Sequence, residues 1–198
     1  MTKNDKKGLR ARLDDIYKWS VKSGVAIATP NSLRVQWNKV IEELNELLYH
    51  CNGCGVRDRL NASWKKAVID DIGDILISFI NLLNINPKKT SGVFSKNEKR
   101  MSKAEKLILE KVRLTDFSKS QAKRDEMYVI DRIFDFLHFA YLNKGRDLSN
   151  EVLFDFLYRL IYLFELIKFK FGINVSLRNC IYTSFCEIQG RQYEIRVR

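Results

Sequence analysis

Apolar residues recur three and four positions apart along most of the chain, with polar and charged residues between them. Residues at this spacing lie on one face of an α-helix, so each such stretch predicts an amphipathic helix. The predicted helices cover residues 13–23, 32–50, 62–83, 125–142, 151–171 and 176–189. Only two prolines and nine glycines interrupt 198 residues, which favours long helices over a sheet with many turns. The sequence therefore predicts an all-α bundle of about six helices.

Several residues between these stretches are typical of helix ends. Gly24 and Gly172 follow apolar stretches and are expected to end them. Asn31 or Ser32 is expected to cap the second helix, and Ser149 to cap the helix over 151–171.

One domain is expected over residues 11–198, after a basic tail at 1–10. A long connection at 84–102 is rich in lysine, and a short amphipathic helix is predicted after it at 103–114. The end of the chain, 191–198, is expected to be a short extended piece.

Two short acidic clusters lie inside two of the apolar stretches. They are Glu42-Glu43-Leu44-Asn45-Glu46 and Asp70-Asp71-Ile72-Gly73-Asp74. Carboxylates three residues apart share a helix face, with roughly 5–6 Å between their Cβ atoms, so each cluster presents a pair from one helix. The neighbours at helical spacing are apolar, so at least one carboxylate of each pair is expected at the edge of the core or inside it. The pattern predicts four acidic side chains that face one another: Glu43, Glu46, Asp71 and Asp74.

Such a group of carboxylates calls for a positive charge. A buried anion is unfavourable unless it is paired or bound to a metal, and four facing carboxylates cannot all stay ionised without a cation. Ligands that are all oxygen suit Mg²⁺ or Mn²⁺ rather than Zn²⁺. The alternative is two ordinary amphipathic helices whose acids form ion pairs with Lys39, Lys65 or Lys66.

The same stretch resembles the MazG-type all-α nucleoside triphosphate pyrophosphatases, a superfamily that includes the dimeric dUTPases and dCTP pyrophosphatases. Its motif is EExxE followed by ExxD, which the two clusters occupy with Asp71 in place of the usual Glu. The resemblance covers roughly residues 14–86 and, loosely, 172–193, where Glu187-Ile188-Gln189-Gly190-Arg191 is similar to a C-terminal EIKDR segment. Residues 87–148 are outside it and read as an insertion. Gln189 and Gly190 depart from the Lys and Asp of that segment.

The resemblance implies Mg²⁺-dependent hydrolysis of a nucleoside triphosphate to monophosphate and pyrophosphate, by attack at the α-phosphorus. It also implies a homodimer or homotetramer. In this assignment the four facing carboxylates bind Mg²⁺, with Mn²⁺ as the alternative ion. Glu42 takes a proton from the attacking water or supports a ligand, and Lys39 and Arg191 hold phosphate oxygens.

Two more residues near the acids are candidates to contact the base. Trp37 offers an aromatic face for stacking, with a place in the core as the alternative. Asn81 follows Asp74 by seven residues and so shares its helix face, where an amide can read a base edge.

The formal net charge is +11, which favours an anionic partner. A nucleoside triphosphate is the expected one. Nucleic acid is the alternative, but the lysine-rich connection has only Phe94 where stacking would call for interleaved aromatic residues. The rival functions are a narrow dUTP or dCTP pyrophosphatase and a non-enzymatic helical nucleic-acid-binding protein with structural acids.

Two further expectations concern location and metals. No apolar run reaches the roughly 18 residues of a membrane span, and no apolar segment follows the basic start of the chain, so a cytoplasmic location is expected. Cys51 and Cys54 have the C-x₂-C spacing of a zinc half-site, with incidental thiols as the alternative.

Overall fold

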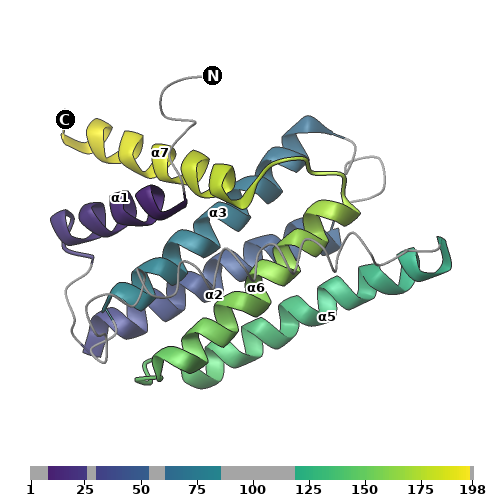
Figure 1. Ribbon diagram of the computed structural model, residues 1–198, viewed down its shortest axis with the longest axis horizontal. Coiled ribbons are helices and arrows are strands. Elements are labelled where there is room, and N and C mark those ends of the chain that lie inside the picture. The colour runs from purple at the N-terminus through teal and green to yellow at the C-terminus, as the bar shows by residue number, and fades with distance from the viewer. Residues whose placement is uncertain (1–8, 26–29, 54–60, 86–118, 197–198) are drawn as a thin grey trace.

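The computed structural model describes residues 9–25, 30–53, 61–85 and 119–196. Within these ranges the chain forms six α-helices and no β-strand, which confirms the predicted all-α class. The helices are α1 (Leu9–Lys22), α2 (Pro30–Gly53), α3 (Ala62–Ile85), α5 (Lys119–Asn143), α6 (Asn150–Lys170) and α7 (Leu177–Arg196) (Figure 1). Among them, none is both long enough and apolar enough to cross a membrane. The helix predicted at 103–114 lies outside the described residues.

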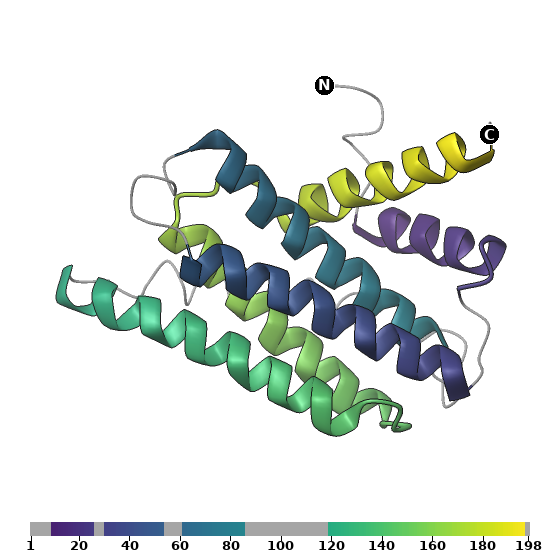
Figure 2. The ribbon, with the colours of Figure 1, turned by 180° about the vertical axis from the view of Figure 1, so that it is seen from behind.

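The helix α3 is at the centre of the bundle. It contacts α1, α2, α6 and α7, and every residue from Ile75 to Ile85 is buried. The helices α2, α5 and α6 form one group with α3, and α1 and α7 pack against α3 on its other side (Figures 1 and 2). Because the second acidic cluster belongs to α3, its carboxylates are held by the least exposed element of the fold.

Aromatic side chains join the four helices of that group. The Trp37 ring of α2 lies 6.3 Å from Phe79 of α3, 6.2 Å from Phe139 of α5 and 6.1 Å from Phe156 of α6, measured between centroids. Phe156 also stacks on Phe79 at 5.1 Å and on Phe139 at 4.8 Å. Aromatic pairs at these distances stabilise a core beyond the area they bury. This cluster fixes how α5 and α6 sit against the acidic helices.

Gly73, inside the second acidic cluster, is the point where α7 crosses α3. A Cβ atom at Gly73 would lie 2.5 Å from the carbonyl oxygen of Cys180 and would overlap Ser184 Oγ. Ser184 Oγ in turn donates a hydrogen bond to the carbonyl oxygen of Asp70 at 3.2 Å. Glycine is therefore required here by the close approach of two helices, and not by its backbone angles.

The predicted helix ends at Ser149, Gly24 and Gly172 are confirmed. Ser149 Oγ accepts a hydrogen bond from the backbone N–H of Val152 at 3.4 Å and caps α6. Gly24 and Gly172 follow α1 and α6 with φ of 78° and 61°, the left-handed conformation that glycine adopts without a steric penalty.

Three predicted boundaries are wrong. The helix α1 begins at Leu9, inside the predicted tail. The cap predicted at Asn31 or Ser32 lies inside α2, because a proline suits the first helical position and α2 begins at Pro30. The extended piece predicted after residue 190 is helical as far as Arg196, since no proline follows and a single glycine is tolerated within a helix.

The helix α6 carries a buried ion pair. Lys168 Nζ lies 2.6 Å from Glu165 Oε1, and both residues are buried. A buried charge is tolerated when its partner is close, as it is here. Burial raises the pKa of the neighbouring Cys180 thiol to about 11, so this cysteine stays protonated and is not a nucleophile at neutral pH.

Candidate functional site

The acidic cluster of α2 surrounds one lysine. Lys39 Nζ lies 2.8 Å from Glu43 Oε1 and 3.0 Å from Glu42 Oε1. The two carboxylates differ in exposure, since Glu43 is 4% exposed and the Glu42 side chain is 57% exposed. Burial raises the pKa of Glu43 above its ordinary value, although the ion pair with Lys39 opposes the shift. Glu43 is therefore the buried anion that the sequence predicts on this helix, and Lys39 is its present partner.

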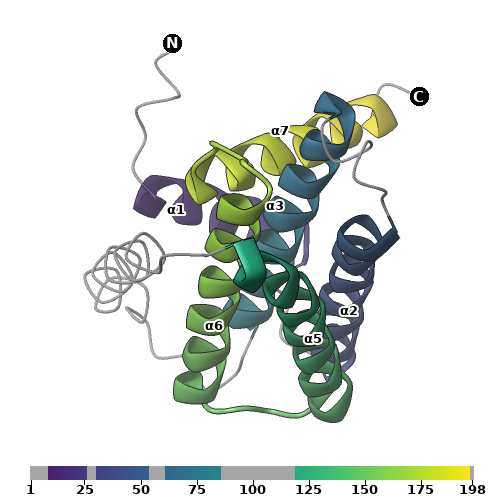
Figure 3. The ribbon, with the colours of Figure 1, turned by 90° about the vertical axis from the view of Figure 1, so that its right-hand side faces the viewer.

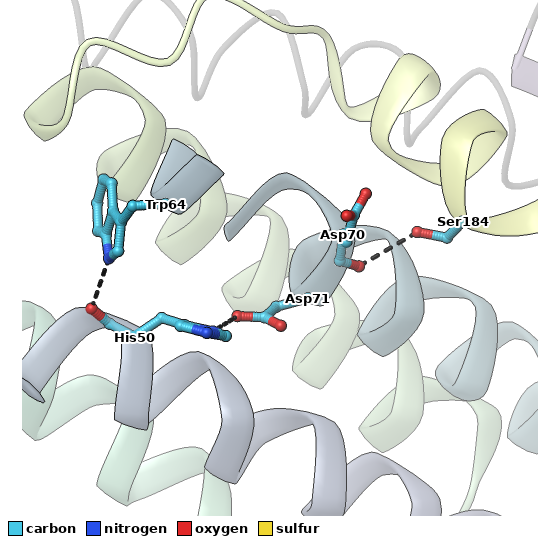
Figure 4. Close-up of polar contacts among 5 residues, drawn as sticks. All are labelled: His50, Trp64, Asp70, Asp71 and Ser184. Carbon is cyan, nitrogen blue, oxygen red and sulfur yellow. Dashed lines mark hydrogen bonds and ion pairs between the residues drawn. The ribbon is translucent and has the colours of Figure 1, made fainter. Parts of the chain in front are cut away.

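The acidic cluster of α3 is joined to α2 by a histidine. His50 Nδ1 lies 2.6 Å from Asp71 Oδ2, and the backbone carbonyl of His50 accepts a hydrogen bond from Trp64 Nε1 at 3.0 Å (Figure 4). Asp71 is buried, at 5% exposure. Burial raises the pKa of Asp71 to about 7, while the bond to His50 lowers it. The contact between His50 and Asp71 thus joins the two helices at a buried carboxylate.

The carboxylates of the two helices influence each other. Besides burial, the negative charges of Glu46 and Glu43 raise the pKa of Asp71, so these α2 side chains lie within electrostatic reach of α3. The antiparallel register explains why, because Trp37 meets Phe79 toward one end of the helix pair and His50 meets Trp64 toward the other. The predicted approach of the two acidic clusters is therefore supported for Glu43, Glu46 and Asp71.

The carboxylates do not converge on one point. In the described part of the chain, no three His, Cys, Asp or Glu side chains are grouped so that they could hold a metal ion. Glu46 is exposed and Asp74 is half-buried. The donor type fits Mg²⁺, and burial raises the pKa of both Glu43 and Asp71. In this conformation, however, Lys39 and His50 hold the two most buried carboxylates.

The alternative ion pairs predicted for the acids are formed in part. Lys39 pairs with the first cluster. Lys66 Nζ lies 3.7 Å from Glu187 of α7, and Lys65 Nζ lies 3.5 Å from the carbonyl oxygen of Gly172.

The other predicted site residues are Trp37, Asn81 and Arg191. Trp37 is 1% exposed and its ring contacts three phenylalanines, so the structure favours the core alternative over base stacking. Asn81 is buried, and its Oδ1 atom has no hydrogen-bond partner among the described residues; the same holds for Gln36 Oε1. A buried amide oxygen without a partner is uncommon, and a ligand can satisfy it. The side chain of Arg191 lies outside the described residues.

The sequence reasoning missed His50 as a member of the site. The signal was present, because His50 follows Glu46 by four residues and Glu43 by seven, and so lies on the same face of α2. The C-x₂-C pair that begins at the next residue instead suggested that His50 only marks the end of the helix. Cys51 is buried, and Cys54 lies outside the described residues.

Asp71→Asn is expected to stabilise the protein more near pH 8 than near pH 5, with a difference on the order of 2–3 kcal/mol between the two. With a folded-state pKa of about 7, Asp71 keeps a proton that the unfolded chain has released above pH ~4. The stability that protonated Asp71 contributes is complete below the pKa of the unfolded chain. It is lost as the pH rises through the folded-state pKa of about 7. Asparagine has no charge to bury, so it avoids this loss.

Urea unfolding at the two pH values measures the effect, with Asp131→Asn on the exposed face of α5 as the control. An equal change in unfolding free energy at both pH values would show that Asp71 does not titrate in this range.

Comparison with known proteins adds no family assignment, since no family model matches this chain. No curated protein and no solved structure matches it either.

Proposed function

We propose that this chain is a Mg²⁺-dependent nucleoside triphosphate pyrophosphohydrolase of the MazG-like type. One observation carries the proposal: Glu43 and Asp71 are two carboxylates buried on adjacent helices, at 4% and 5% exposure. A fold that keeps such groups beside one another gains most from a divalent cation that binds them. The spacing of the two acidic clusters, EExxE and DxxD, supports the same assignment.

Mg²⁺ would be held by Glu43, Glu46, Asp71 and Asp74, with Mn²⁺ as a substitute. Lys39 and His50 each contact one oxygen of these buried carboxylates, so a metal would compete with Lys39 for Glu43 and with His50 for Asp71. When bound, the metal supplies charge neutralisation for the phosphates and a lower pKa for the attacking water.

Protein side chains supply the rest of the proposed reaction. Lys39 is half-exposed, and once released from Glu43 it is free to contact a phosphate oxygen. Glu42 is exposed beside it and accepts a proton from water or supports a ligand. Asn81 Oδ1 and Gln36 Oε1 are acceptors for donors of the substrate. Hydrolysis then yields the monophosphate and pyrophosphate.

Assembly as a homodimer or homotetramer belongs to the same proposal. Large apolar side chains are exposed on α2 and α5, among them Tyr49, Phe134 and Tyr141. Such residues on an outer helix face are suited to a subunit interface.

A second candidate function is a non-enzymatic binding protein with structural acids. It is favoured by the pairs Lys39–Glu43 and His50–Asp71, and by the lack of a three-residue metal group in the described ranges. The net charge of +11 would then serve an anionic macromolecule such as nucleic acid.

A panel of the common ribo- and deoxyribonucleoside triphosphates, including dUTP, separates the candidates. The proposal predicts release of pyrophosphate and monophosphate in the presence of Mg²⁺ and none with a chelator. Turnover confined to dUTP or dCTP would identify a narrow enzyme of the same type. Release of inorganic phosphate instead of pyrophosphate, or no turnover at all, would contradict the proposal.

A further inference from the structure

A pocket of about 570 Å³ lies between α5 and α6, two helices that run side by side from the loop at residues 144–149 (Figure 3). It belongs to a different helix pair from the acidic clusters, which are on α2 and α3. Its volume is within the roughly 300–1,000 Å³ of small-molecule sites in proteins. None of the residues discussed so far for catalysis lines it.

Aromatic rings form a large part of its wall. Phe156 of α6 lies 4.9 Å from Phe136 and 4.8 Å from Phe139 of α5, so three rings from two helices form a continuous apolar surface. Tyr158 and Tyr162 line the same pocket and are only half-buried, which leaves aromatic surface accessible. A wall of this kind favours a flat ligand that stacks, because every aromatic face can carry such a contact.

The rim of the pocket carries two ion pairs, one on each helix. Arg132 Nη1 lies 2.9 Å from Asp135 Oδ2 on α5, and Arg159 Nε lies 2.9 Å from Asp155 Oδ2 on α6. The formal charge of the rim is therefore balanced, and it offers no excess positive charge to a triphosphate. Each guanidinium keeps further N–H donors, and each carboxylate keeps acceptor positions, so both kinds of hydrogen bond are available to a ligand.

We propose that this pocket binds a neutral, planar heteroaromatic molecule of the nucleobase or nucleoside class. Such a molecule has a ring to stack on the accessible faces of Tyr158 and Tyr162, above the phenylalanine wall. Its edge carries amino groups for Asp135 or Asp155 and carbonyl or ring-nitrogen acceptors for the arginines. The charge balance of the rim selects the nucleoside over the nucleotide. This inference does not depend on the proposed hydrolysis, because it concerns binding at another pair of helices.

The proposal is tested by isothermal titration calorimetry with adenosine, guanosine, cytidine and uridine. The titrations use the full chain in a buffer that contains a metal chelator. At least one nucleoside is expected to bind, and its triphosphate to bind no more tightly. Val152→Trp places a large ring at the pocket wall and should weaken binding at least about tenfold. Val35→Trp is the matched control, since Val35 is an exposed valine of α2 that does not line the pocket.

A second variant protects the test against a folding defect. Arg159 is largely exposed, so Arg159→Ala should fold normally and weaken the same nucleoside about fivefold by removing a donor. The assignment fails if no nucleoside binds at millimolar concentration or if both pocket variants bind as the unmodified protein does. It also fails if the triphosphate binds more than tenfold tighter than the nucleoside and the same two variants weaken that binding.

Discussion

Replacing Gly73 with alanine should destabilise the protein by about 3 kcal/mol or more, a large fraction of the roughly 5–15 kcal/mol by which a typical protein is stable. The added Cβ would overlap Ser184 Oγ and lie 2.5 Å from the carbonyl oxygen of Cys180. A hydroxyl can rotate away, but a helix carbonyl cannot, so α7 would have to move off α3. The shift would also break the hydrogen bond from Ser184 to Asp70, which is part of the acidic cluster.

Chemical unfolding measures this loss, and Gly190→Ala is the matched control. Gly190 also lies in α7, but an added Cβ meets no atom within 4 Å. There the change should stabilise the helix by about 0.5–1 kcal/mol, because alanine has the higher helix propensity. If the two alanine variants were equally stable, α3 and α7 could not cross as closely as the structure has them.

Glu43→Gln should reduce turnover of the best nucleotide by at least about a hundredfold, because an uncharged amide is a poor ligand for Mg²⁺. The same change should leave the fold intact and keep its stability equal or raise it by about 1 kcal/mol. Burial raises the pKa of Glu43, so the ionised carboxylate opposes folding. Lys39 retains Glu42 as a partner after the substitution.

Steady-state pyrophosphate release and thermal unfolding of the same preparations give both readouts. Glu187→Gln removes a carboxylate from a surface pair with Lys66 and should change neither. Full activity in Glu43→Gln would show that Glu43 is not part of the site. A large loss of stability would show that the Lys39–Glu43 pair is needed for the structure of α2.

The helices, and the burial of one acidic side chain on each of α2 and α3, could be predicted because both follow from local spacing. Apolar residues three and four apart define which face of α2 and α3 is buried, and Glu43 and Asp71 fall on that face. What local spacing cannot give is the identity of a partner from another element. The choice of His50 for Asp71 depends on the register between α2 and α3, and that register is set by distant contacts such as Trp37 with Phe79.

Long-range packing also accounts for the other differences. Trp37 looks like a stacking residue beside the acids, but the phenylalanines of α5 and α6 enclose it. Gly73 looks like a spacer between acids, yet the crossing of α7 more than a hundred residues later in the chain requires it. The pocket between α5 and α6 arises in the same way, from two helices whose separation no single stretch of sequence encodes.

The melting temperature with and without Mg²⁺ tests the central claim most directly, namely that the facing carboxylates of α2 and α3 form a divalent-cation site. If Mg²⁺ binds the folded state with a dissociation constant of about 1 mM, about 10 mM of the ion adds roughly 1.4 kcal/mol of stability. For a chain of this size that is a rise of about 3–6 °C. The account predicts this rise for the unmodified protein and none for Glu43→Gln, against sodium chloride of equal ionic strength. An unchanged melting temperature, or the same rise in both proteins, would contradict it.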